Sequence, residues 1–320
     1  MKHKETKEKV EFTIGKSDEL KILIFPSLVF LNESNNDLID KLLSATSTMH
    51  TITFYIKLHE PNCPYFAKLK ETYGAKVVGI TKATEQFNLV FTFGGDGTLL
   101  WLNQFLRYSE PVPIVAVNTG TVGFLTPFEA HDLPLLVKVL EELVDGKPTT
   151  GDFVLSQRKK IDVLLRRENG NEVINRAINE VVIKSANNYA KLFKIFVDDV
   201  LVMKLQADAI VICNQSGSTA YNASLNGPVV LPDTDVLVIN AIAPQNCRFR
   251  PLIISKNDVV RVELEKKFQD HAIVTCDSTE NDTIQLGDSV SVKLSAHTFD
   301  LVCKNSNAEW LKKYRKMFYV

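Results

Sequence analysis

The chain has 320 residues, of which 45% are hydrophobic and 23% are charged, and its formal net charge at pH 7 is -1. The length accommodates two domains, and the composition is that of a globular protein rather than a disordered or membrane-spanning one. A net charge near zero produces no global field that would attract nucleic acid or an acidic membrane, so we expect neither as a partner.

Residues 1–20 are expected to form a disordered tail, and residues 21–148 alternate between strand and helix signals. The expected strands lie at 22–25, 51–56, 76–80, 89–93 and 114–117, and the expected helices at 37–43, 65–72, 98–106 and 133–144. Continuous apolar runs are typical of buried parallel strands. This part of the chain therefore predicts a doubly wound α/β domain with a largely parallel sheet, ending at the helix stop that precedes residue 148.

Residues 149–303 have a different texture, with many short β-like runs and few helical segments. The runs lie at 161–165, 180–183, 193–197, 209–213, 236–242, 259–264, 272–276 and 290–294. Short strands at this spacing predict a second, β-rich domain. The last segment, 304–320, is expected to form a closing helix over 308–317.

The cysteines are spread along the chain without any C-x-x-C pair: Cys63, Cys213, Cys247, Cys276 and Cys303. This pattern argues against a disulfide framework and against a zinc knuckle. It favours small buried thiols in a reducing compartment, so we expect a cytoplasmic protein. Two short basic runs, 158–160 and 312–316, are interpreted as solvated faces.

A glycine-rich loop follows the apolar strand at 89–93. Gly94, Gly95 and Gly97 surround a single carboxylate, Asp96, at the kind of strand end where α/β sheets bind ligands. A lone carboxylate at this place suggests acid–base or metal chemistry. The alternative is an Asp-Gly hairpin turn, against which the amphipathic run at 98–106 argues.

Three further segments contain candidate ligand-binding residues. A second glycine loop, 118–128, contains Phe124, which either stacks on a base or packs in the core. Asn179 and Glu180 begin an apolar strand, where they either read the donors of a nucleoside or form a turn pair. The hydroxyl-rich stretch 216–221 follows another strand and either offers donors to a phosphate or caps a helix. A P-loop, the dinucleotide fingerprint and a G-x-S-x-G elbow are all absent from the sequence.

These motifs occur together as GGDGT at 94–98, NTGTVGFLTPF at 118–128, NEVVI at 179–183 and GSTAY at 217–221. With the stretches 244–251 and 276–278, the chain from about residue 22 onward resembles the NAD kinase family, which phosphorylates the 2′-hydroxyl of the adenosine ribose of NAD. The resemblance implies that NAD⁺ and ATP are substrates and that Mg²⁺ is bound with ATP. It also implies a nucleotide site in the cleft between the domains, a C-terminal helix packed on the first domain, and a homodimer or homotetramer.

The resemblance assigns roles residue by residue. Asp96 matches the general base, and Gly95, Gly97 and Thr98 match the cradle around phosphates. The acceptor nucleotide is expected to contact Phe124 (at the adenine), Asn179, Glu180, Asp208 (near the nicotinamide), Thr219, Ala220, Tyr221, Ser224 and Thr279. No dedicated metal ligands are expected.

The chain also departs from the family pattern, at 213–216 (Cys-Asn-Gln-Ser) and at Gln245. These departures bear on donor choice and acceptor preference and leave Asp96 intact. Two alternatives stay open at this point. One is a lipid kinase of the diacylglycerol or sphingosine type that shares GGDGT, and the other is a non-catalytic NAD-binding sensor.

Overall fold

The computed structural model describes residues 19–27, 37–49, 51–107, 109–120, 123–145, 153–187, 189–246, 248–265, 271–304 and 306–319. The chain divides into two compact units, one formed by Met1–Gln157 with Phe299–Val320 and the other by Arg158–Thr298. Most of the expected N-terminal tail and the segment 146–152, where the sequence places the domain boundary, lie outside the described residues.

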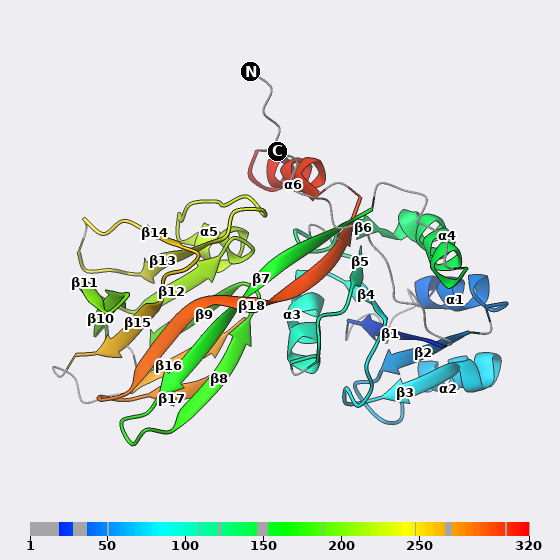
Figure 1. The fold of residues 1–320 in the computed structure, drawn as a ribbon, viewed down its shortest axis with the longest axis horizontal. Coiled ribbons are helices and arrows are strands. Elements are labelled where there is room, and N and C mark those ends of the chain that lie inside the picture. The colour runs from blue at the N-terminus through cyan, green and yellow to red at the C-terminus, as the bar shows by residue number, and fades with distance from the viewer. Residues whose placement is uncertain are drawn as a thin grey trace. The chain divides into compact units, whose positions relative to one another are not determined.

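The first unit alternates strands and helices along the chain (Figure 1). Its elements are β1 (Leu20–Pro26), α1 (Asp37–Ala45), β2 (Ile52–Lys57), α2 (Pro64–Tyr73), η1 (Gly74–Lys76), β3 (Val77–Ile80), β4 (Leu89–Gly94), α3 (Asp96–Phe105), β5 (Ile114–Asn118), β6 (Phe128–Glu129), η2 (Ala130–Asp132), α4 (Leu133–Val144) and, from the C-terminus, α6 (Ser306–Phe318).

Five of these strands form a parallel sheet in the order β3-β2-β1-β4-β5. The chain order runs outward from β1 in one direction and then returns to β4 on the other side of β1. The strand order thus reverses between β1 and β4, and ligands of open α/β sheets bind outside the carboxyl ends of the strands at such a point. Asp96 comes just after β4, with Gly95 between them, so the fold places it there.

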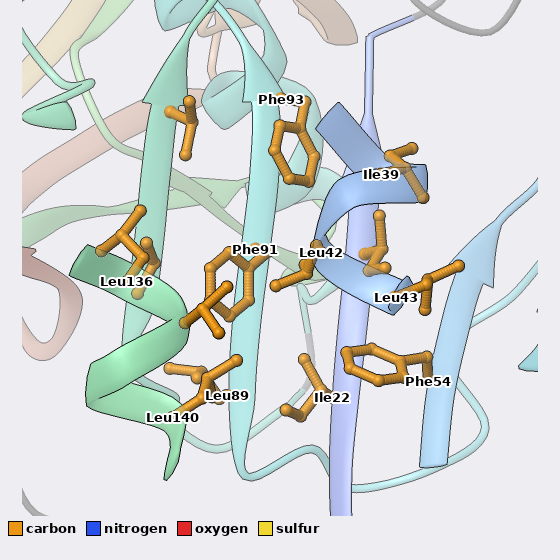
Figure 2. Close-up of a cluster of buried hydrophobic side chains, with 14 of the residues drawn as sticks. Ile22, Ile39, Leu42, Leu43, Phe54, Leu89, Phe91, Phe93, Leu136 and Leu140 are labelled. Carbon is orange, nitrogen blue, oxygen red and sulfur yellow. The ribbon is translucent and has the colours of Figure 1, made fainter. Parts of the chain in front are cut away.

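Helices cover both faces of this sheet, as expected for a doubly wound domain. Figure 2 shows α1 and α4 over β1, β2 and β4, with Ile22 and Phe91 packed among Leu42 and Leu140. On the opposite face Phe25 meets Trp101 of α3 at a ring-centroid distance of 5.8 Å. Alternate residues of β1 therefore fill two apolar layers, which accounts for its continuous apolar sequence.

The second unit is built from antiparallel strands. Its elements are β7 (Val154–Arg166) and β18 (Ser289–Cys303), which also reach into the first unit, with β8 (Glu172–Ala177), β9 (Glu180–Ser185), β10 (Lys191–Val197), β11 (Val200–Ala207), β12 (Ala209–Asn214), η3 (Gly217–Thr219), α5 (Tyr221–Ser224), β13 (Val236–Ile242), β14 (Leu252–Ser255), β15 (Val260–Leu264), β16 (Ala272–Cys276) and β17 (Thr279–Ile284).

One sheet of this unit has the order β14-β13-β12-β9-β16-β17, and the strands β11, β10, β15 and β18 follow one another in a second sheet, where β18 also pairs with β7. The inward side chains of both sheets share one apolar cluster that includes Val181, Ile212, Phe193 and Val292. The central strands β9 and β12 are hydrogen-bonded on both edges, and this rigid pair carries the polar residues described below.

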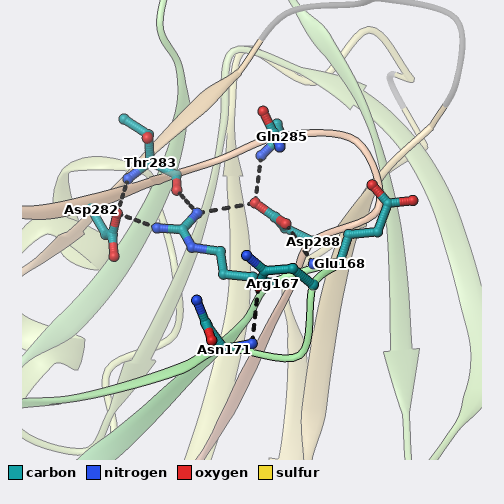
Figure 3. A network of polar contacts seen from close by, with 8 residues as sticks. Arg167, Glu168, Asn171, Asp282, Thr283, Gln285 and Asp288 are labelled. Atoms are coloured by element: carbon teal, nitrogen blue, oxygen red, sulfur yellow. Dashed lines mark hydrogen bonds and ion pairs between the residues drawn. The ribbon is translucent and has the colours of Figure 1, made fainter.

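An arginine network ties two turns of the second unit together (Figure 3). Arg167, which follows β7, donates to the Asp288 carboxylate at 3.0 Å and also contacts Asp282 and the carbonyl of Thr283. Asp288 is buried and also accepts the backbone N–H of Glu168. We assign this network a structural role, since the Arg167 guanidinium and the Asp288 carboxylate bond to groups of the protein itself.

Every strand and helix expected from the sequence is present, and the two predicted fold classes are confirmed. The hairpin alternative for Asp96 is wrong, because α3 begins at that residue. Five strands, β6, β8, β11, β14 and β17, were not anticipated. Within the described ranges, no helix is long and apolar enough to cross a membrane.

Candidate active site

Asp96 is the first residue of α3 and is held in a fixed orientation by the second glycine loop. Its Oδ2 accepts the backbone N–H of Phe124, and its Oδ1 accepts that of Leu125, both at 2.9 Å. A carboxylate oxygen can accept more than one hydrogen bond, so each oxygen keeps capacity for a further donor. The geometry therefore presents an oriented carboxylate that can still accept a proton.

Burial raises the pKa of Asp96 above its ordinary value, because the charged form loses hydration. The two backbone N–H groups and the positive charge of Lys313 oppose that effect without cancelling it. A carboxylate with a raised pKa is a stronger base than an exposed one. The environment thus favours proton acceptance at this position.

The main chain beside Asp96 is accessible. A Cβ built on Gly95 or on Gly97 would meet nothing within 4 Å, so a ligand can approach the backbone there. Thr98 differs, because it is buried, and its Oγ1 would lie 2.1 Å from a Cβ on Gly94. The backbone of Gly95 and Gly97 is thus open to a ligand, whereas Thr98 packs against Gly94.

The second glycine loop is shaped by Gly123, which has a φ of 123°. A Cβ at this glycine would lie 2.0 Å from Thr126 Oγ1, so the close turn requires glycine here. Phe124 is half-buried and lies 5.8 Å, between ring centroids, from Trp310 of α6. The ring thus packs against Trp310 but is only half-buried, so both interpretations of Phe124 stay open. Thr121 and Val122 lie outside the described residues.

In the second unit, Asn179 and Glu180 are fixed by a buried carboxylate. Asp277 accepts the backbone N–H groups of Ile178 at 2.7 Å, Asn179 at 2.8 Å and Glu180 at 3.4 Å. Burial, together with the charge of Asp277, raises the pKa of Glu180 to about 7, and the N–H of Tyr221 opposes the shift. Glu180 is therefore partly protonated near neutral pH, while Asp277 with its three donors ionises first.

The segment after β12 comes close to the same residues. The N–H of Asn214 donates to the carbonyl of Asn179 at 3.2 Å, and a Cβ on Gly217 would lie 2.0 Å from that carbonyl oxygen. Glycine at 217 is thus required by the close approach of the two main chains. Cys213 is buried and lies opposite Glu180 in the antiparallel pairing of β12 with β9. Burial raises the pKa of its thiol, which makes the thiol unreactive.

A group of buried polar atoms at this place lacks hydrogen-bond partners among the described residues. They are Asn179 Oδ1, Glu180 Oε2, both side-chain atoms of Gln215 (Oε1 and Nε2), and Ser216 Oγ. Buried polar groups are nearly always satisfied, and leaving one unpaired costs about 1–3 kcal/mol. Four such residues at one end of β9 and β12 indicate a site that a polar ligand completes.

The hydroxyl-rich stretch mostly satisfies itself. Ser218 Oγ donates to Gln215 O at 2.8 Å, Thr219 Oγ1 to Ser216 O at 3.3 Å, and Ser224 Oγ to Tyr221 O at 2.7 Å. The helix α5 that follows has four residues, and no side chain caps it. The capped helix start is therefore not found, and the phosphate alternative stays a prediction. The backbone N–H of the exposed Tyr221 donates to the Glu180 carboxylate, so Tyr221 and its neighbour Ala220 lie beside Glu180.

Two predicted contact residues lie at different ends of the strand pair. Asp208 is exposed and precedes β12, whose first residue pairs with Lys184 at the end of β9 remote from Glu180. Thr279 follows the tight turn of Asp277 and Ser278, which both have positive φ, and pairs with Cys276. The structure therefore groups Thr279 with Asn179 and Glu180 and separates Asp208 from them along the strands.

Sequence reasoning missed three residues of these sites. Asp277 was noted only as part of a motif, and its three backbone contacts could not be anticipated. Gln215 was noted only as a departure from a family pattern. Lys313 belongs to a basic run interpreted as a solvated face, which is wrong for this residue, because it is half-buried and donates to backbone carbonyls.

Comparison with known proteins agrees with this architecture. The family model described as ATP-NAD kinase N-terminal domain matches residues 41–147, and the model described as ATP-NAD kinase C-terminal domain matches residues 178–303. The chain belongs to the ATP-NAD kinase family. Because both domains match, the lipid-kinase alternative is set aside.

Named NAD kinases are similar to this family member over most of its length. The NAD kinase of Caldanaerobacter subterraneus subsp. tengcongensis is 32% identical over 243 residues, covering 74% of this chain and 80% of the relative. The NAD kinase of Methanosarcina barkeri is 33% identical over 213 residues, covering 66% of this chain and 71% of the relative.

Two solved structures share the fold. A yeast NADH kinase complexed with NADH superposes with a TM-score of 0.80 at 18% identity, covering 94% of this chain and 88% of that one. An NAD kinase from Archaeoglobus fulgidus in complex with ATP gives a TM-score of 0.65 at 20% identity, covering 93% and 100%. At these identities the likeness is one of fold.

Proposed function

We propose that the protein transfers the γ-phosphoryl group of ATP to the 2′-hydroxyl of the adenosine ribose of NAD⁺ and so produces NADP⁺. Family membership supports the reaction class. The observation that carries the proposal is the carboxylate of Asp96, which two backbone N–H groups orient at the switch point of the sheet beside open glycine backbone.

In this proposal Asp96 acts as general base. It takes the proton of the ribose hydroxyl while the hydroxyl oxygen attacks the γ-phosphorus, and ADP leaves. General-base assistance of this kind contributes roughly 10²–10⁴-fold to the rate. The hydrogen bonds from Phe124 and Leu125 keep the carboxylate oriented through the transfer, so its second lone pairs stay available to the substrate.

The acceptor nucleotide is proposed to bind at Asn179 and Glu180. The unpartnered oxygens of both side chains would accept hydrogen bonds from hydroxyl or amino groups of the nucleotide. Tyr221, Ala220 and Thr279 lie at the same end of the strands and complete the proposed contact surface. The positions of Asp208, Phe124 and the expected interdomain cleft stay predictions.

The donor is proposed to be ATP with its Mg²⁺ ion. Phosphoryl transfer depends mainly on positioning and on neutralising phosphate charge, and the metal bound by the phosphates supplies much of that. Among the described residues there is no group of three or more His, Cys, Asp or Glu side chains that could hold a metal ion. The proposal therefore treats Mg²⁺ as part of the donor, MgATP, with the triphosphate against Gly95 and Gly97.

A direct assay tests the reaction. Purified protein is incubated with MgATP and NAD⁺, and an NADP-specific dehydrogenase detects the product. The Asp96→Asn variant should lose roughly 10²–10⁴-fold in kcat, while its KM for NAD⁺ and its Tm stay close to wild type. Retention of near-normal kcat by this variant would show that Asp96 is not the base. NAD⁺ binding without any NADP⁺ formation by the wild type would favour the sensor alternative instead.

We also propose that the protein forms a homo-oligomer and works in a reducing cytoplasm. Strand β11 lies at a sheet edge and exposes Val200, Leu201 and Val202, and exposed apolar edges are common association sites. The buried free thiols of Cys213, Cys276 and Cys303 fit a reducing compartment. Light scattering after size exclusion measures the assembly. A monomeric mass at micromolar concentration would refute the proposed homo-oligomer.

A further inference from the structure

We infer that Lys313, on the C-terminal helix α6, is a positioning residue for the proposed reaction: it clamps the loop whose backbone orients Asp96. The inference rests on the proposed function, in which Asp96 is the general base. It adds a functional role for the last helix of the chain, which nothing in the glycine motifs requires.

The first argument is where the lysine bonds. The Nζ of Lys313 donates to the carbonyl of Gly123 and to the carbonyl of Thr126. Between these two carbonyls lie Phe124 and Leu125, whose N–H groups bind the two oxygens of Asp96 at 2.9 Å. One ammonium group therefore fixes both ends of the short segment that holds the carboxylate, and any shift of the loop would reorient it.

The second argument is that the same face of α6 makes another contact with the loop. Trp310 is buried and lies 5.8 Å from the ring of Phe124, and it also stacks on Tyr314 at 5.6 Å with an interplanar angle of 7°. Residues 310, 313 and 314 have the spacing of one helical face. The aromatic contact seats the helix, and the lysine then reaches the loop carbonyls from a fixed position.

The third argument is electrostatic. Among the described residues, the groups that act on the Asp96 carboxylate are the charged Lys313 on the helix side and the neutral N–H groups of Phe124 and Leu125. Its positive charge lowers the pKa of Asp96 against the effect of burial. Removing this charge raises that pKa further, so the base is ionised only at higher pH.

A set of three variants tests the inference. Lys313→Met removes the charge and both hydrogen bonds while keeping an apolar stem. Lys313→Arg keeps a cation that can donate to both carbonyls. Arg315→Met is the matched control, since it removes one positive charge from an exposed position of the same helix. Each variant is measured for kcat and KM over pH 5–9 and for hydrogen exchange of a peptide spanning 123–126.

Lys313→Met should lower kcat about 10- to 100-fold, because misplacement of a catalytic group by about 1 Å has effects of that size. Both KM values should stay within about twofold, and the ascending limb of the kcat–pH profile should move to higher pH. Exchange at Phe124 and Leu125 should accelerate. Lys313→Arg should recover most of the kcat, and Arg315→Met should match wild type in every measurement.

Two results would overturn the inference. One is a Lys313→Met variant with wild-type kcat, pH limb and exchange. The other is a loss of kcat that Arg315→Met or Lys313→Arg shares in full. If Lys313→Met fails to fold by circular dichroism, Lys313→Gln takes its place, since it removes the charge and keeps a polar side chain at this half-buried position. Wild-type kcat, pH limb and exchange in that variant would then overturn the inference. Hydrogen exchange does not depend on turnover, so it tests the role of Lys313 separately from the reaction. If the wild type is inactive but only Lys313→Met exchanges faster, the proposed function is refuted while the contact of Lys313 with the loop is supported.

Discussion

The unpartnered amide of Gln215 allows a test in which stability and binding change in opposite directions. Gln215 is 2% exposed, and neither its Oε1 nor its Nε2 has a hydrogen-bond partner among the described residues. We expect it to contact the acceptor nucleotide, because it adjoins Asn214, whose N–H donates to Asn179. The Gln215→Met variant keeps the length of the side chain and removes the amide.

The magnitude follows from the cost of burying an unsatisfied polar group, about 1–3 kcal/mol. Gln215→Met should raise the free energy of unfolding of the unliganded protein by about that amount. For a unit of this size the Tm should rise by about 2–10 °C. Each neutral hydrogen bond lost to the nucleotide weakens binding by about 0.5–1.5 kcal/mol, so the KM for NAD⁺ should increase about 2- to 10-fold.

The assay pairs thermal unfolding of the unliganded protein with steady-state kinetics, and Gln285→Met is the matched control. Gln285 is exposed, so its amide is hydrated and its replacement should change neither quantity. A Gln215→Met variant with a lowered Tm and an unchanged KM would refute the reasoning. It would mean that internal water satisfies the amide and that Gln215 supports the fold rather than the ligand.

Two further predictions concern the same end of β9. Because the pKa of Glu180 is raised to about 7, its carboxylate gains a proton as the pH falls from 8 to 6, and the KM for NAD⁺ should rise by up to about tenfold. The folded state also binds more protons than the unfolded state above the ordinary glutamate pKa, so the free energy of unfolding should fall as the pH rises through 7. Glu180→Gln should flatten both dependences, and a Glu180→Gln variant that kept the wild-type pH profile of KM would show that another group titrates. Gly217→Ala places a methyl group 2.0 Å from the carbonyl oxygen of Asn179, so it should lower the Tm and raise the KM for NAD⁺; unchanged values of both would show that the chain relaxes without moving Asn179.

Much of the fold could be predicted, because local signals determine it. The buried parallel strands are continuous apolar runs, and the glycine loop at 94–97 is followed at once by helical spacing, so Asp96 could be placed at a strand end. The unanticipated strands lack such a signal. Strand β11, for example, begins with three exposed apolar residues, Val200, Leu201 and Val202, so its apolar residues do not alternate between a buried and an exposed face there.

The contacts that position the site could not be predicted in the same way. Lys313 lies 187 residues after Thr126, whose carbonyl it contacts. It belongs to the basic run 312–316, whose composition is typical of a solvated face. The contact between Phe124 and the ring of Trp310 could not be predicted from the glycine loop either. Both cases depend on which distant segment packs against a motif, and the motif itself contains no such information.

The carboxylates of Asp277, Asp96 and Glu180 differ in how many backbone N–H groups they accept, and this difference fits their proposed roles. Asp277 accepts three, two on Oδ1 and one on Oδ2, and these contacts shape the start of β9. Asp96 accepts two, one on each oxygen, so it is oriented but keeps a lone pair on each for a proton. Glu180 accepts one and keeps a whole oxygen unpartnered. Burial raises the pKa of all three carboxylates, so the pKa alone does not separate their roles. The difference lies in the oxygens: Asp96 is oriented on both and can still take a proton, whereas Glu180 offers one whole oxygen to a hydroxyl donor.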